Sequence, residues 1–211
     1  MQILAIDTAS PTPSVTLLAR GGVWEEVLPP DRRASEELLP AIERCLASAG
    51  AKLAECDRIA VCSGPGSFTG LRVGLATAWA LGRATDVPIE TVPTLEVLAE
   101  TAREPGIDRV AGVLDAGRGD VVLAVYSLDG ARARIEEAPE RLPIAEALRR
   151  VTNVPTVALP SDLLGPETPP ATLSPSRALA LAVARAPGAA LSRLEGIYSR
   201  PSAAEEKHGA S

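Results

Sequence analysis

Aromatic residues, histidine and long apolar runs are all scarce in this chain. Aromatic side chains account for 2% of its 211 residues, although hydrophobic residues account for 46%. The core is therefore predicted to consist mainly of Ala, Val, Leu and Ile, and the length suits one large domain or two lobes of about 100 residues each. No apolar run reaches the roughly 18 residues that a membrane span needs, and no basic segment precedes the first apolar run. We expect a soluble, cytoplasmic protein that does not enter a membrane.

The few histidines and cysteines limit the metal and catalytic sites that the chain can form. His208 is the only histidine, so two-histidine metal sites and Ser-His-Asp triads are unavailable within the chain. The three cysteines, Cys45, Cys56 and Cys62, form no C-x-x-C pair, which indicates reduced structural thiols. We therefore expect no bound metal and no catalytic residue.

The chain also lacks an excess of basic residues. Its net charge is −6 and its isoelectric point is about 5.0. Proteins that bind nucleic acid unaided usually present a basic face that neutralises phosphates. The paired arginines, such as Arg132 with Arg134 and Arg149 with Arg150, are interleaved with acidic residues and are typical of solvated surface charge. Any contact with RNA is therefore expected to be shared with a partner.

Apolar runs and helical periodicities in the first half predict an opening β-meander followed by alternating helices and strands. Gly50 is expected to cap the first helix, and Thr94 is expected to be the N-cap of the third. The strands are predicted at residues 2–7, 14–19, 23–28, 57–62 and 89–92, and the helices at 35–49, 71–83 and 94–103.

A Glu-Pro-Gly segment at residues 104–106 is the best candidate for a linker between two lobes, at residues 1–104 and 105–211. The second half is predicted to contain strands at 109–115 and 121–128, a helix at 176–185, a loop-like region at 155–170 and a polar tail. Both halves open with a strand, an aspartate, a turn and a second strand. This echo fits a duplication, but coincidence explains it equally well.

The most distinctive stretch is SGPGSFTGLR at residues 63–72, which follows a buried strand and opens a helix. Such a turn can bind anions through free backbone N–H groups. Its spacing, however, matches neither the phosphate loop nor the dinucleotide fingerprint. Spacing alone therefore favours a tight strand-to-helix turn that is capped by Ser67 or Thr69.

Small residues recur every four positions in the helix that follows: Gly70, Gly74, Ala78 and Gly82. Glycine inside a helix costs up to about 1 kcal/mol relative to alanine, so the stripe indicates close approach of another element, most simply a helix. That neighbour is either the 35–49 helix or a partner subunit, and the spacing leaves both open.

Asp7, Thr8 and Asp115 lie where strands end, and they are the remaining candidates for chemistry. An aspartate in such a turn could face a nucleotide and its metal. Its more usual role is to close an Asx turn or to cap a helix.

Three motifs resemble the TsaB (YeaZ) family. They are ILAIDTA at residues 3–9, SGPGSFTGLR at 63–72 and LDAGRGD at 114–120, and they occur in the order and spacing of that family. The resemblance covers roughly residues 1–130. It implies an α/β protein with a two-lobed actin-like (ASKHA, ribonuclease H-like) fold, in which each lobe has a mixed sheet and flanking helices.

The resemblance also implies a role in forming N6-threonylcarbamoyladenosine in tRNA. A chain of this family is a non-catalytic accessory subunit that docks on the catalytic paralogue TsaD together with the ATPase TsaE, and it meets tRNA only through the complex. Docking, and homodimerisation in isolation, use the first two helices of the N-terminal lobe. On this hypothesis Gly74→Arg would abolish partner binding and leave the monomer folded. The expected interface residues are Leu38, Leu39, Ile42, Leu46, Gly70, Leu71, Gly74 and Ala78.

No tightly bound cofactor is expected, although weak or vestigial ATP binding at Asp7, Thr8 and Asp115 is compatible with the resemblance. The alternative is an autonomous ATP-dependent kinase or hydrolase of the actin-like superfamily, with Asp7 and Asp115 around a magnesium nucleotide. The sequence shows no evident general base or basic phosphate clamp for such an enzyme.

Overall fold

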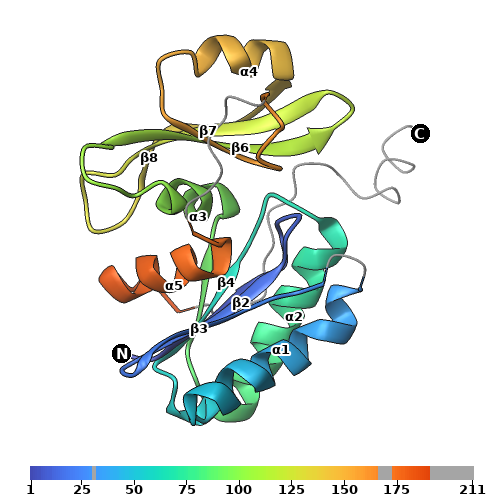
Figure 1. The fold of residues 1–211 in the computed structure, drawn as a ribbon, viewed down its shortest axis with the longest axis vertical. Helices are drawn as coiled ribbons and strands as arrows, with labels where there is room; N and C mark the ends of the chain where they lie inside the picture. The colour runs from blue at the N-terminus through green and yellow to red at the C-terminus, as the bar shows by residue number, and fades with distance from the viewer. Residues whose placement is uncertain (30–31, 166–172, 191–211) are drawn as a thin grey trace.

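Helices and sheets alternate in five layers in the computed structural model, which describes residues 1–29, 32–165 and 173–190 (Figure 1). Two helices cover the outer face of the first sheet, two lie between the sheets, and one covers the outer face of the second sheet. In that order they are α1 (Ala34–Ala49) and α2 (Phe68–Thr85), α3 (Thr94–Thr101) and α5 (Pro175–Arg185), and α4 (Ile144–Arg150). No helix in the described ranges is long and apolar enough to cross a membrane.

The first sheet has the strand order β3-β2-β1-β4-β5. Its first three strands form the predicted antiparallel meander, and β4 and β5 run parallel to β1. The central strand β1 is buried on both faces, which explains its continuous apolar run. The bounds are β1 (Ile3–Asp7), β2 (Ser14–Ala19), β3 (Gly22–Val27), β4 (Arg58–Cys62) and β5 (Ile89–Val92).

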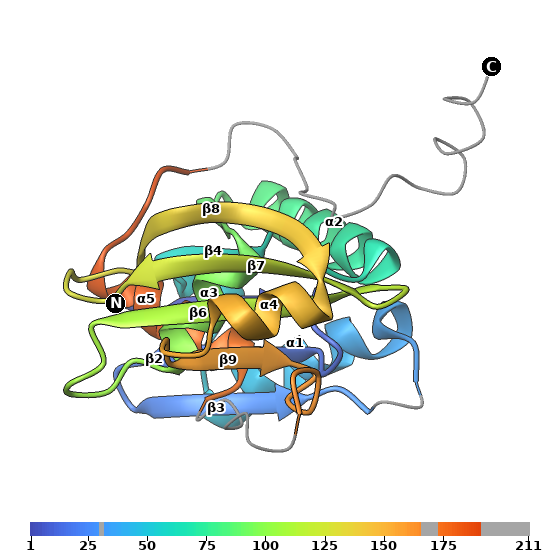
Figure 2. The same ribbon diagram turned by 90° about the horizontal axis from the view of Figure 1, so that it is seen from above.

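The second sheet repeats the first four strands of this pattern, with the order β8-β7-β6-β9. Strands β6, β7 and β8 form an antiparallel meander, and β9 runs parallel to β6. Figure 2 shows β8 and β9 at the two edges, with α4 crossing the sheet. The bounds are β6 (Arg109–Gly117), β7 (Asp120–Ser127), β8 (Arg134–Pro143) and β9 (Thr156–Leu159). The predicted α/β fold with a mixed sheet in each lobe is therefore confirmed.

Three elements of the second half were not predicted: β8, α4 and β9. Strand β8 is an edge strand whose residues are exposed except Leu142, so it carries no apolar alternation. Strand β9 has only four residues between two prolines, and the prediction of a loop at 155–170 is wrong for this part. Residues 166–170, the tail after residue 201 and His208 lie outside the described residues.

Three predicted caps can be compared with the structure. Gly50 ends α1 in the left-handed conformation, with φ of 61°, and the Ser67 hydroxyl accepts a hydrogen bond from the Gly70 N–H at the start of α2. Both predictions are confirmed. Thr94 is not an N-cap, because α3 begins at this residue. Its hydroxyl oxygen instead accepts the Gly64 N–H at 3.1 Å, which attaches α3 to the glycine-rich turn.

One helix from each side of the linker expected near residue 105 packs against the sheet of the other lobe. Helix α3 precedes that linker but packs Leu95 and Leu98 against the second sheet. Helix α5 follows it but packs Leu179 and Val183 against the inner face of the first sheet. The division at residues 104 and 105 stays a prediction about the linear sequence, and the two lobes share the layer formed by α3 and α5 (Figure 1).

Candidate functional site

The glycine-rich turn between β4 and α2 packs directly on the residues that follow β1. The Ser67 N–H donates to the Ala9 carbonyl at 2.9 Å, and a Cβ atom on Gly66 would lie 2.3 Å from the same oxygen. The amides of Gly70 and Leu71 donate to the side chain and the carbonyl of Ser67. Because these donors are already used, the turn is the capped strand-to-helix connection that its spacing favours, and they are not free to bind phosphate.

The small-residue stripe of α2 faces its own sheet. A Cβ atom would lie 1.9 Å from the Thr8 carbonyl oxygen at Gly70, 2.2 Å from the Thr8 hydroxyl at Gly74 and 2.6 Å from Ile89 Cδ1 at Gly82. The Thr8 hydroxyl also donates to the Gly70 carbonyl at 2.7 Å. At these three glycines the close neighbours are therefore the turn after β1 and strand β5, whereas Ala78 belongs to the core cluster that also includes Leu38 and Ile42 of α1. The glycines let α2 approach the ends of the strands.

This packing changes what the predicted interface residues can do. Leu39 is 50% exposed and Leu46 is half-buried, so these two can meet a partner. The other six are buried within the monomer, where they hold α1 and α2 on the sheet: Leu38, Ile42, Gly70, Leu71, Gly74 and Ala78. Docking through α1 and α2 stays a prediction, but it has to use the outward residues of these helices.

Sequence reasoning missed a second row of small residues, on the opposite side of α2. Ala76, Ala80 and Ala84 are exposed and recur every four positions, two residues out of step with Gly74 and Ala78. At 3.6 residues per turn, a shift of two positions moves a side chain to the far side of a helix. This spacing was available in the sequence as the signal of an outer face.

Asp7 is fully buried and closes its own turn. Its carboxylate accepts the N–H groups of Ala9 at 3.0 Å and Ser10 at 3.3 Å, together with the Ser10 hydroxyl. The Cys62 thiol also hydrogen-bonds to it, and burial raises the pKa of Asp7. The Asx-turn alternative is therefore confirmed for Asp7, and its oxygens are occupied by groups of the protein.

Asp115, in contrast, is exposed at the corresponding turn of the second sheet. Its carboxylate accepts the Gly117 N–H at 2.7 Å, and the turn continues through Gly117 and Arg118 with positive φ angles of 71° and 61°. One short hydrogen bond from the N–H group two residues further on is again an Asx-turn arrangement. In the part of the chain that the structure describes, no group of three or more His, Cys, Asp or Glu side chains could hold a metal ion.

A cavity of about 390 Å³ lies beside the first of these turns, at the starts of α1 and α2. Its wall includes the hydroxyl-bearing residues Thr8, Ser10 and Ser67 and the side chains of Arg32 and Arg33. The arginines form ion pairs at 3.0 and 3.9 Å with glutamates in the first turn of α1, so their charge is locally balanced. The cavity can admit a small polar molecule, but it offers no concentrated positive charge.

Two stacked mixed sheets, each opening with a strand, an aspartate, a turn and a second strand, define the two-lobed actin-like class of α/β proteins. A family model described as "TsaD: tRNA N6-adenosine threonylcarbamoyltransferase" matches residues 12–158. The chain belongs to this family, and the relatives below confirm its resemblance to the TsaB (YeaZ) group.

Three relatives define the extent of the similarity. The tRNA threonylcarbamoyladenosine biosynthesis protein TsaB of Escherichia coli is 37% identical over 130 residues, which are 61% of this chain and 56% of that protein. The structure of YeaZ from Pseudomonas aeruginosa, 28% identical, superposes with a TM-score of 0.75 over 93% of this chain and 99% of that chain. The tRNA N6-adenosine threonylcarbamoyltransferase of Rhizobium meliloti is 46% identical over 86 residues, 40% of this chain and 23% of that protein. The chain spans about half the length of the curated TsaB relatives that it matches.

Proposed function

We propose that this chain is a non-catalytic accessory subunit in the biosynthesis of tRNA threonylcarbamoyladenosine. It docks on the catalytic paralogue TsaD and acts together with the ATPase TsaE. The observation that carries this proposal is the state of Asp7. The carboxylate that an actin-like enzyme would direct at a metal nucleotide is buried and bonded to Ala9, Ser10 and Cys62. Because this carboxylate is already bonded within the protein, the turn fits a structural role better than a catalytic one.

The outward sides of α1 and α2 support docking at this face. Leu39 is the most exposed leucine of the described chain, and the exposed alanines Ala76 and Ala80 lie on the second helix. Small side chains let the backbone of a partner helix approach closely, and an exposed leucine supplies apolar area to bury. The same face forms the homodimer when the partner is absent.

The remaining properties of the subunit follow from its net charge and from the two turns in which Asp7 and Asp115 are already hydrogen-bonded. A net charge of −6 gives the isolated chain little attraction for phosphates, so tRNA is met only through the complex. No cofactor is tightly bound, and any ATP binding is weak. The subunit works in the cytoplasm and does not enter a membrane.

Reconstituted transfer of the threonylcarbamoyl group to tRNA tests the proposal. TsaD and TsaE are assayed without this chain, with it, and with the Ala76→Arg variant, whose new side chain blocks the outer face of α2. Activity is expected to depend on the chain and to be lost with Ala76→Arg. Ala145→Arg places the same exposed substitution on α4 and is expected to support full activity. Equal activity with and without the chain would refute the accessory role.

An autonomous ATP-dependent kinase or hydrolase is the second candidate, because both sheets carry the strand, aspartate and turn arrangement. Calorimetric titration of the isolated chain with ATP and magnesium separates the two candidates. We expect no binding in the micromolar range. Micromolar affinity that is lost in Asp115→Ala would favour the enzyme.

A further inference from the structure

A buried ionic cluster connects the two lobes, and neither the accessory role nor the alternative enzymatic role uses it. Its three carboxylates come from β5 and α3, and its guanidinium groups come from β4, the end of α3, the turn between β7 and β8, and α5. The members are Glu90, Glu96, Glu100, Arg58, Arg103, Arg132 and Arg185. The prediction of solvated surface charge is wrong for Arg132: its side chain is 19% exposed, whereas that of Arg134 is 68% exposed.

Glu90 is the centre of one half of the cluster and is 1% exposed. Its carboxylate lies 2.5 Å from the Arg132 guanidinium, and Arg58 is on its other side at 3.3 Å. Arg132 also contacts Glu96 at 2.5 Å. A buried carboxylate is strongly unfavourable without such partners, so Glu90 holds Arg132 in place from the edge of the first sheet.

Glu100 is the centre of the other half, and its side chain is fully buried. It accepts two hydrogen bonds from Arg103, at 2.7 and 2.9 Å, one from Arg185, and one from the backbone N–H of Ala133 at 2.5 Å. Arg103 in turn donates to the carbonyl groups of Leu128 and Gly130, at 2.7 and 2.9 Å. The carboxylate and its arginine therefore both bind the turn between β7 and β8.

All the bonds that reach the second sheet end in one short segment, residues 128–133. The segment is gripped through its backbone as well as through Arg132, so any change in the angle between the sheets would separate several buried charges together. Glu90 and Arg58 lie at the beginnings of β5 and β4, whereas Asp7 and Cys62 end β1 and β4. Because β4 and β5 run parallel to β1, the cluster lies at the end of the first sheet that is remote from the Asp7 turn.

We propose that this cluster is an inter-lobe lock, which fixes the angle between the two sheets and prevents the lobes from closing on a ligand. The lock makes the chain one rigid body. This inference does not depend on the proposed accessory role, because it concerns the motion of the isolated chain.

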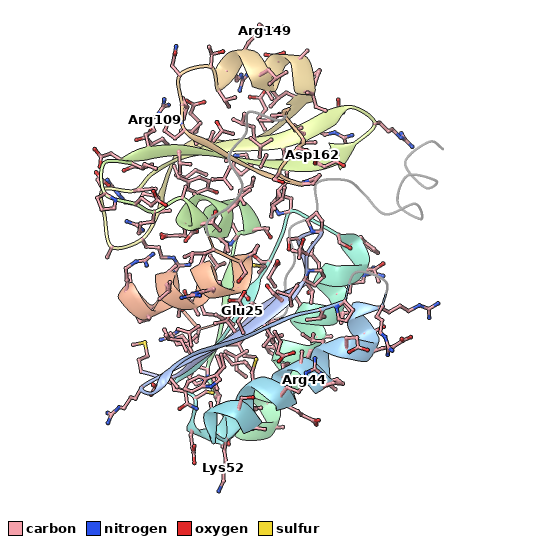
Figure 3. All side chains as sticks on the ribbon, viewed as in Figure 1. Glu25, Arg44, Lys52, Arg109, Arg149 and Asp162 are labelled. Carbon is pink, nitrogen blue, oxygen red and sulfur yellow. The ribbon has the colours of Figure 1, made fainter. Side chains whose placement is uncertain are left out.

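Distances between spin labels in the two lobes test the lock. Lys52→Cys and Arg149→Cys place labels on exposed positions at opposite ends of the molecule (Figure 3). The three native cysteines are at most 6% exposed and are expected to stay unlabelled in the folded protein, which a sample without added cysteines verifies. Double electron–electron resonance should give one narrow distance distribution, unchanged by ATP and magnesium. A shift of the distribution on adding nucleotide would overturn the proposal.

Arg132→Met removes the charge that bridges the lobes, and we expect it to widen the distribution at least twofold. Arg134→Met is the matched control, because Arg134, the first residue of β8, pairs at 2.9 Å with Asp129 of the adjoining turn. If Arg132→Met does not fold, the same distance measurement is made on Arg132→Lys. This variant keeps the positive charge but loses the guanidinium group that contacts Glu90 and Glu96 together. A folded Arg132 variant with a distribution as narrow as that of the Arg134 control would refute the lock.

Discussion

The two sheets open with the same arrangement, yet their aspartates have different surroundings. Asp7 is buried, accepts three hydrogen bonds within its turn, and lies next to Thr8, which contacts α2. Asp115 is exposed, and its one short hydrogen bond closes a turn with three consecutive positive φ angles, at residues 117–119. The same backbone arrangement therefore forms a buried turn that packs against α2 in one lobe and an exposed surface turn in the other. A repeated topology does not establish a repeated site.

The largest expected effect comes from disrupting the close packing of α2 against the turn that follows β1. Gly74→Arg inserts a side chain where even a Cβ atom would lie 2.2 Å from the Thr8 hydroxyl. We expect the free energy of unfolding to fall by more than about 4 kcal/mol, so that little folded monomer remains. This replaces the sequence-based prediction that the variant would fold and lose only its partner.

Thermal and urea unfolding followed by circular dichroism measure this change, with Ala76→Arg as the control. The control adds the same side chain to the exposed side of α2 and is expected to change stability by less than about 0.5 kcal/mol. Equal stability of the two variants would contradict the orientation of the helix.

Comparison of Asp7→Ala with Asp115→Ala tests the two turns directly. Asp7→Ala leaves the N–H groups of Ala9 and Ser10 buried without an acceptor, and we expect a loss of about 3 kcal/mol in the free energy of unfolding. Asp115→Ala leaves an N–H group that water can reach, and we expect a loss of less than about 1 kcal/mol. Urea titrations of both variants give the difference, and similar losses would show that the two turns are equivalent.

The smallest effect concerns pH. Burial raises the pKa of Asp7 above the ordinary aspartate value of 3.8, against the opposing hydrogen bonds from Ser10, Ala9 and Cys62. The folded protein therefore holds this proton more tightly than the unfolded chain does. Its contribution to stability is fully present below pH 3.8 and is lost as the pH rises through the folded pKa.

We expect the stability of the wild type relative to Asp7→Asn to decrease from pH 3.8 upwards until the folded pKa is passed, by at most about 1.4 kcal/mol per pH unit. Urea titrations of both proteins across this range measure the trend. Parallel pH profiles would show that Asp7 titrates alike in the folded and unfolded states.

The first sheet could be predicted from the sequence because its strands are apolar runs that end in clear turn signals. Strand β8 could not, because an exposed edge strand has no apolar face to alternate. The spacing of Gly70, Gly74 and Gly82 predicted close packing correctly, but the identity of the neighbour depends on the angle at which α2 crosses the strands. That angle is a tertiary property, so the neighbour could not be identified from the spacing, whereas the outward row that includes Ala76 and Ala80 was visible in it.

The inter-lobe lock was beyond prediction for a related reason. Glu90 and Arg132 are 42 positions apart, and nothing in their local sequence distinguishes them from solvated charges. When two charged residues are far apart in the sequence, they can be recognised as a buried ion pair only once the fold is known, because the fold determines whether both lie where water is excluded.

The return of α5 to the first sheet has a consequence for synthesis on the ribosome. The inner face of β1, formed by Ile3 and Ala5, is covered by α5, whose Leu179 and Val183 come more than 170 positions later in the chain. While the polypeptide emerges, that face has no such cover. The amino-terminal lobe therefore completes its core only after residue 185 has left the exit tunnel, and the nascent chain exposes apolar surface to chaperones until then.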